Sequence, residues 1–208
     1  MSTIFAQLPD DIQTALATNA GIVLKEFDPN MEMSVLETAR QTIKQNILFA
    51  TTGGVNTSCA YTYKDLGEDI DNCPKDAKEM LEVEKIECKL GGTGVTITPE
   101  SAVSLFGAAD KSGSEVVKID PRRDVKLTDF KSLWYVCPYG TDHGFVAVKL
   151  ENALSVGGFS SQSTKKDKTQ FTFDYKGFSS LANPEKVPFE YYIKAKSSVP
   201  AVMTSPKV

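Results

Sequence analysis

The sequence contains only one histidine, His143, and one tryptophan, Trp134. His143 follows Asp142 in an expected turn. A catalytic set of Cys137, Asp142 and His143 would need their side chains to face one another within hydrogen-bond reach, which neighbours in a strand and turn rarely do. The chain also lacks a phosphate-binding loop, a dinucleotide fingerprint and a nucleophile elbow. We therefore expect no enzyme, no catalytic residue, no cofactor and no cofactor-binding residue.

The cysteines lack the spacing of a metal site. They are Cys59, Cys73, Cys88 and Cys137. None forms a CxxC pair, and a single histidine cannot complete a zinc site, so no metal ligand is expected. Four free thiols suit a chain made in the reducing cytoplasm of a cell.

Long apolar runs are missing as well. No segment approaches the roughly 20 apolar residues that cross a bilayer, and residues 1–11 lack the basic and apolar regions of a signal peptide. We therefore expect no membrane association. The charge balance is 23 Lys and Arg against 27 Asp and Glu, a net charge of −4. Such a chain is a poor candidate for gripping nucleic acid, although DNA can pass it without binding.

What the sequence does contain is a series of short β-strand patterns separated by turns, which is typical of a β-sandwich or barrel. The clearest strand covers 168–176. There Phe171, Phe173 and Tyr175 alternate with polar residues, so these aromatic side chains are expected to face the core.

Two helices accompany the expected strands. Apolar residues at helical spacing over 31–47 predict a flanking helix. Thr98 followed by Pro99 predicts the N-cap and first residue of a second helix. The length of 208 residues favours one domain over 1–195, with a long loop at about 64–78 and a flexible tail over 196–208.

A hairpin is expected around Gly91 and Gly92, which form a strong turn signal between strands at 81–90 and 93–98. One face of this hairpin is apolar and would pack on the sandwich. The other face, which includes Lys85, Glu87 and Lys89, is polar and would face water.

Several segments together resemble the major tail protein of siphophages that infect Gram-positive bacteria. They occur in the same order as in that family and cover about 21–195. The segments are 50–56, 65–75, 122–125, 133–136, 144–148, 152–159 and 187–191.

The resemblance implies a β-sandwich tail-tube fold with a flanking helix. Proteins of that family form hexameric rings that stack around a tape-measure protein, and each subunit gives strands to a barrel that lines the lumen. The expected location is the virion tail, after assembly in the host cytoplasm. The expected partners are further copies of the chain, the tape-measure protein, and the tail terminator and distal tail proteins. Double-stranded DNA passes through without specific binding.

Two groups of residues are candidate sites under this interpretation. Glu82, Glu84 and Glu87 are candidates for an acidic lumen wall, since a basic wall would retain DNA; the competing interpretation is that they are solubility residues of the outer surface. The loop at 64–78 is a candidate for contact with the adjacent ring, since long loops in compact domains often bind something. Its acidic residues are Asp65, Glu68, Asp69 and Asp71. They depart from the calcium-loop pattern and are otherwise expected to be a solvated surface.

Two other classes of protein are alternatives. A β-sandwich adhesion or carbohydrate-binding module would need exposed aromatic residues for sugar stacking, and Trp134 lies within an apolar strand. A small hydrolase would need a base and a nucleophile, which a lone turn histidine supports poorly.

Overall fold

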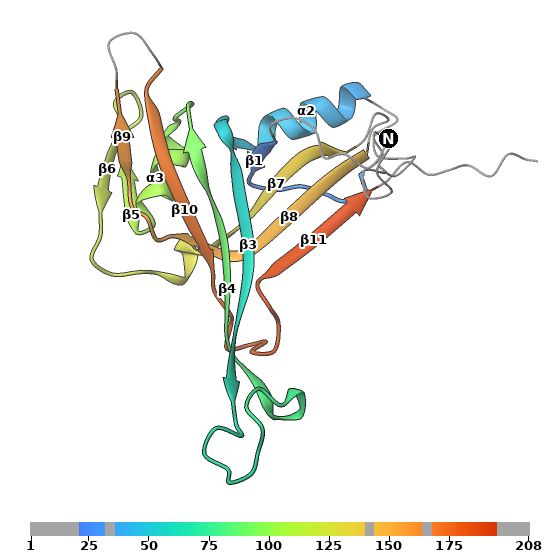
Figure 1. Cartoon of the computed structure of the whole chain (residues 1–208). Coiled ribbons are helices and arrows are strands. Elements are labelled where there is room, and N and C mark those ends of the chain that lie inside the picture. The colour runs from blue at the N-terminus through green and yellow to red at the C-terminus, as the bar shows by residue number, and fades with distance from the viewer. Residues whose placement is uncertain (1–20, 32–35, 140–143, 164–167, 195–208) are drawn as a thin grey trace, which may run out of the picture.

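The computed structural model describes residues 21–31, 36–139, 144–163 and 168–194, and it confirms the expected mainly β fold (Figure 1). Nine strands form one antiparallel sheet in the order β2-β1-β7-β8-β10-β4-β3, with β11 beside β8 and β9 beside β10. These strands are β1 (Ile22–Leu24), β2 (Ile47–Phe49), β3 (Thr51–Asp65), β4 (Leu81–Gly94), β7 (Lys131–Tyr139), β8 (Gly144–Ser155), β9 (Ser160–Gln162), β10 (Gln170–Gly177) and β11 (Phe189–Lys194). A second, two-stranded sheet pairs β5 (Ala109–Ser112) with β6 (Lys118–Pro121).

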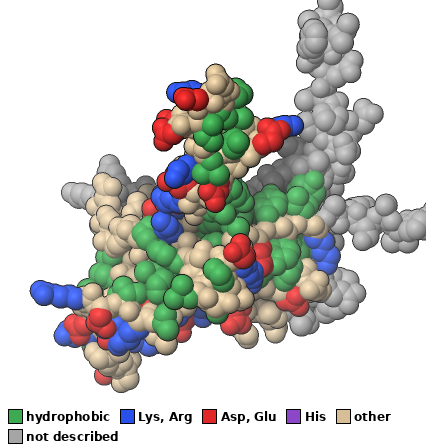
Figure 2. Space-filling view, turned by 90° about the horizontal axis from the view of Figure 1, so that it is seen from below, with side chains coloured by type: hydrophobic (Ala, Val, Ile, Leu, Met, Phe, Trp, Pro, Cys, Tyr) green, Lys and Arg blue, Asp and Glu red, His purple; other side chains and the backbone are tan. Residues whose placement is uncertain are grey.

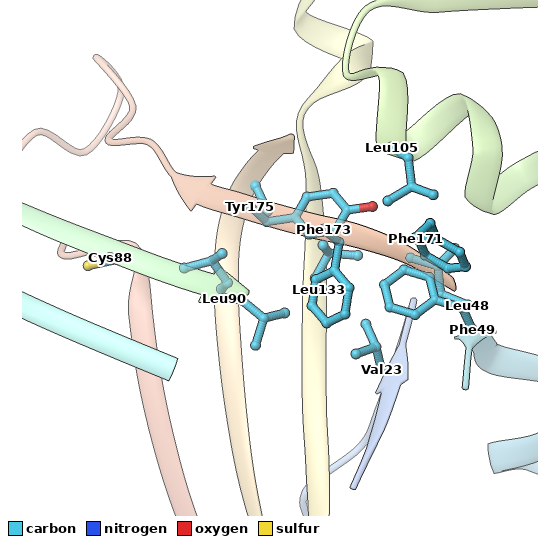
Figure 3. Packing of buried hydrophobic residues seen from close by; sticks show 12 residues of the cluster. Val23, Leu48, Phe49, Cys88, Leu90, Leu105, Leu133, Phe171, Phe173 and Tyr175 are labelled. Atoms are coloured by element: carbon cyan, nitrogen blue, oxygen red, sulfur yellow. The ribbon is translucent and has the colours of Figure 1, made fainter. Parts of the chain in front are cut away.

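The large sheet turns back on itself, so that its two halves enclose the main core. Figure 3 shows the aromatic rings of β10 facing Leu133 of β7 and Val23 of β1. Phe171, Phe173 and Tyr175 are each at most 3% exposed, which confirms the buried face expected from their alternation. The resulting architecture is sandwich-like, because both halves bury one face against the other.

A second core lies on the other face of β7 and β8, beneath helix α2 (Leu36–Asn46). Phe27 packs edge-on against Trp134 and Phe145, with ring centroids 5.6 and 5.1 Å apart. Ile43 of α2 packs against the same cluster. This helix, expected from the pattern over 31–47, therefore covers a sheet face that would otherwise expose aromatic rings.

Helix α3 (Pro99–Phe106) confirms the second expected helix and its cap. The Thr98 hydroxyl accepts a hydrogen bond from the Ser101 backbone N–H at 3.2 Å, and the Ser101 hydroxyl accepts one from the Thr98 N–H at 2.7 Å. Two one-turn helices, η1 (Lys78–Met80) and η2 (Leu127–Asp129), lead into β4 and β7. The proposed tail over 196–208 lies outside the described residues.

The expected hairpin turn at Gly91 and Gly92 is wrong. β4 continues through both glycines, and its hairpin partner is β3, which precedes it in the chain. Gly92 and Gly94 are the register partners of Phe173 and Phe171, and a Cβ at either glycine would lie within 3.0 Å of a ring carbon. These glycines make room for two core rings instead of reversing the chain.

An ion-pair network links β11 to β8. Glu190 is the register partner of Lys149, and its carboxylate also lies 3.0 Å from the Lys186 Nζ. The hydrogen bond from the Tyr192 hydroxyl, together with both lysines, lowers the pKa of Glu190 to about 2.

This network predicts an acid sensitivity. An unfolded glutamate has a pKa of about 4.3, so the unfolded chain binds the proton first as the pH falls. The stabilisation is present above that pH and is lost as the pH approaches 2. Urea denaturation should therefore show Glu190→Gln less stable than the parent at pH 7, with the gap closing between about pH 4.5 and 2. A gap that is independent of pH would contradict this assignment.

Candidate assembly interface

A two-stranded arm projects from the sandwich (Figure 1). We define the arm as residues 61–85, which include the outer ends of β3 and β4 and the residues that join them. In the arm β4 pairs with β3 alone, because β10 pairs only with residues 89–94 of β4. The arm is therefore a ribbon with two open edges, a form that is marginally stable without a partner.

One face of the arm is apolar and exposed. Tyr63 and Val83 are register partners, and the Tyr61 and Tyr63 rings stack with centroids 6.3 Å apart. Between 41% and 57% of each of Tyr61, Tyr63, Leu81 and Val83 is exposed. Figure 2, which views the molecule from the side of the arm, shows hydrophobic side chains on it among charged ones. We call these four residues the apolar patch of the arm.

The loop at the end of the arm is held by its own hydrogen bonds. The Asp65 carboxylate accepts hydrogen bonds from the backbone N–H groups of Asp76, at 3.0 Å, and Gly67, at 2.8 Å. These two bonds lower the pKa of Asp65. Asp65 therefore stabilises the loop, whereas the side chains of Glu68, Asp69 and Asp71 are exposed and available for contact.

A β-bulge determines which face the candidate glutamates occupy. The register shifts between Val83 and Lys85, so Glu84 has no partner on β3. Glu82, the partner of Lys64, consequently lies on the same face of the arm as Lys85 and Glu87. The structure thus brings Glu82 and Glu87 onto one face, and places Glu84 in the bulge between them.

Glu87 is surrounded by lysines. Its carboxylate lies 3.3 Å from the Lys176 Nζ, 3.5 Å from the Lys89 Nζ and 3.7 Å from the Lys85 Nζ. The hydrogen bond from Lys176 and the charges of the other two lysines lower the pKa of Glu87. The face that carries the candidate glutamates is therefore polar with mixed charge, and is not uniformly acidic.

The polar face extends across three strands. On β3, β4 and β10, the residues opposite to the buried aromatic face are polar or glycine, apart from Ala60. Among the described residues, β3 pairs only with β4, which leaves its other edge open along the whole strand. At the other edge of this three-stranded region lies the short strand β9, which among the described residues pairs only with β10. This sheet has one packed face, one polar face and two open edges.

The candidate nucleophile Cys137 and the potential metal ligands can be located among the described residues. Cys137 is buried in β7, and burial raises the pKa of its thiol, which is the opposite of an activated nucleophile. Its imagined partners Asp142 and His143 lie outside the described residues. No cluster of three or more potential metal-ligating side chains occurs in the ranges that the structure covers.

Two further observations concern the alternative classes. Trp134 is 6% exposed and packs against Tyr192 with ring centroids 5.4 Å apart, so it presents no free face for sugar stacking. None of the helices in the described part of the chain is long and apolar enough to cross a membrane.

Fold and surface together define a mainly β, sandwich-like protein with a projecting two-stranded arm. The sequence matches no known protein-family model and no curated protein. The apolar patch of the arm is the feature that sequence reasoning missed. Its signal on β3 was the alternation of Tyr61 and Tyr63. The matching alternation on β4 is interrupted by the bulge at Glu84.

Proposed function

We propose that this chain is a structural subunit of a phage tail tube, which assembles into stacked, hexameric rings around a lumen for DNA. The observation that carries the proposal is the sheet of β3, β4 and β10. It packs one face into the core, presents a polar face to water and leaves β3 open along one edge. A water-filled tube lined by strands needs subunits with these three properties.

Ring closure would use the two open edges. The free edge of β3 in one copy would pair with β9 in the next, so that every copy gives one edge and receives the other. Such a heterologous contact closes into a ring when its rotation divides a full turn. Closure also removes the unpaired backbone groups that an exposed edge strand presents.

The arm would make the contact between rings. It projects beyond the sandwich, and the apolar patch formed by Tyr61, Tyr63, Leu81 and Val83 is only about half covered by the described residues of one copy. Covering this patch with a neighbouring copy would stabilise the two-stranded ribbon as well as the stack. The exposed acids Glu68, Asp69 and Asp71 would lie near that contact.

The lumen wall would be the polar face of β3, β4 and β10, with Glu82 and Glu87 on it and Glu84 at its bulge. Lysines beside Glu87 offset its charge, so the wall would be hydrated without a strong field of either sign. Such a wall lets DNA pass without specific binding. The tape-measure, tail terminator and distal tail proteins are the further proposed partners, in a virion tail assembled in the host cytoplasm.

Negative-stain electron microscopy of the concentrated protein tests the proposal. We expect hollow tubes or annular particles that grow with protein concentration, because edge pairing is a second-order process. A protein that stays strictly monomeric at high concentration, and that never enters a particle when its phage partners are supplied, would contradict the proposal.

Removing the end of the arm should separate stacking from folding. We expect a variant that lacks residues 67–73 to keep the circular dichroism spectrum of the sandwich but to form no tubes. A matched variant, Glu68→Gln with Asp69→Asn and Asp71→Asn, keeps the loop and removes only its exposed charge, so it shows whether charge or shape matters. Normal tubes from the deletion variant would refute the role of the loop.

A further inference from the structure

Two of the four thiols face each other where the arm leaves the sandwich. Cys59 of β3 and Cys88 of β4 are register partners, and their sulfur atoms lie 3.6 Å apart. Opposed residues in an antiparallel pair have Cα atoms about 4.5 or 5.5 Å apart, and both separations fit a disulfide. Closing the sulfur atoms to a bond of about 2.05 Å therefore requires side-chain movement but no change of register.

The two thiols differ in access. Cys88 is fully buried, whereas Cys59 is half-buried and meets a reagent from solvent first. Burial and the hydrogen bond with Cys59 raise the pKa of Cys88 to about 12. The raised pKa keeps Cys88 protonated, and its burial keeps dissolved reagents away from it, so we expect Cys88 to react only after Cys59, with a sulfur that the chain itself holds beside it.

We propose that Cys59 and Cys88 form a modification site, at which a small-molecule disulfide such as oxidised glutathione introduces a cross-strand disulfide. In the first step the Cys59 thiol loses its proton, its sulfur bonds to one glutathione sulfur, and the other glutathione leaves and takes up a proton. In the second step Cys88 loses its proton and attacks the Cys59 sulfur, which releases the remaining glutathione as a thiol. Two protein thiols are oxidised by two electrons and one glutathione disulfide is reduced to two thiols.

This disulfide would fix the base of the arm. Sliding β3 past β4 by one residue would move the Tyr61 and Tyr63 side chains to the other face of the ribbon. A covalent bond between the register partners excludes that slip and confines residues 60–87 in a closed loop. The inference concerns the single chain and does not depend on whether it forms tubes.

The test uses the full chain with Cys73→Ser and Cys137→Ala, which leaves only the two facing thiols. After treatment with oxidised glutathione, we expect both thiols to disappear and the mass to fall by about 2 Da. Trypsin cleavage after Lys75 or Lys78 should then leave two fragments joined on a non-reducing gel and separated on a reducing gel. Adding Cys59→Ser should abolish the link and leave the fragments separate on both gels.

Three results would overturn the proposal: both thiols persisting in the folded protein, a glutathione adduct that never resolves, or disulfides formed only between chains. If the variant that lacks Cys73 and Cys137 does not fold, peptide mapping of the oxidised parent chain shows whether Cys59 and Cys88 have become joined. A peptide pair that contains Cys59 joined to Cys88 supports the proposal, and any other pairing contradicts it.

Discussion

Thr57→Pro and Ser58→Pro are expected to separate folding from assembly, because only one of these substitutions removes an N–H group from the open edge of β3. Both residues have partners on β4, and in an antiparallel pair successive residues alternate between bonding the partner strand and pointing away from it. Proline is tolerated on an edge strand where its missing N–H would have faced solvent. One variant should therefore keep every bond to β4, while the other should lose at least one.

The variant that keeps its bonds to β4 should fold with nearly the stability of the parent but form far fewer tubes. Each subunit contact would lose a backbone hydrogen bond, worth about 0.5–1.5 kcal/mol, and would gain a proline ring between two strands. The loss recurs at every contact around a ring, so we expect a reduction in tube yield of more than tenfold by microscopy. Urea denaturation of both variants identifies which one remains stable.

The two neighbouring substitutions serve as controls for each other. If the stably folded variant produced tubes in normal yield, the edge of β3 would not be the ring contact, and the proposed closure would be wrong. Failure of the destabilised variant alone would carry no weight, because it is explained by folding.

Phe173→Ala is expected to give the largest loss of stability among single substitutions in the aromatic stripe of β10. Phe173 is 3% exposed, and its ring centroid lies 4.8 Å from that of Phe49. Its ring also covers the bare backbone of Gly92. Removing it leaves a cavity that the sheets cannot close, so we expect unfolding to become easier by about 3–5 kcal/mol.

A matched control lies next to it on the same strand. Thr172→Ala changes the exposed face of β10 and should alter the free energy of unfolding by no more than about 0.5 kcal/mol. Urea denaturation monitored by circular dichroism measures both variants. A loss below about 1 kcal/mol for Phe173→Ala would show that the ring is not a central core element.

The contact between Phe173 and Gly92 explains why the turn at Gly91 and Gly92 was wrongly predicted. Gly92→Ala should be destabilising when Phe173 is present, because the new Cβ would lie 2.9 Å from a ring carbon. In the Phe173→Ala background the same change should be less destabilising, because only the Gly54 carbonyl oxygen, 3.0 Å from the new Cβ, would still be close. A double-mutant cycle that gave equal effects in both backgrounds would contradict this account.

Local patterns were sufficient wherever the interaction that decides the structure lies within one segment. The alternation of Phe171, Phe173 and Tyr175 predicted their buried face, and the Thr98-Pro99 pair predicted the start of α3. These were confirmed because strand alternation and helix capping depend on residues a few positions apart. The polar face that carries Glu87 was also expected from alternation, although the lysines that surround it come partly from β10.

The tertiary structure alone decided which strands became neighbours, and this determined the rest. A Gly-Gly pair alone favours a tight turn over a strand, and the rings of β10 that lie across Gly92 and Gly94 are what favour the strand here. The arm likewise exists because β10 ends its pairing at Lys89 while β3 and β4 continue, and the bulge at Glu84 rotates Glu82 to the face of Glu87. Sequence determines local periodicity, because that is a property of the chain; strand partners depend on packing between segments that lie far apart in it.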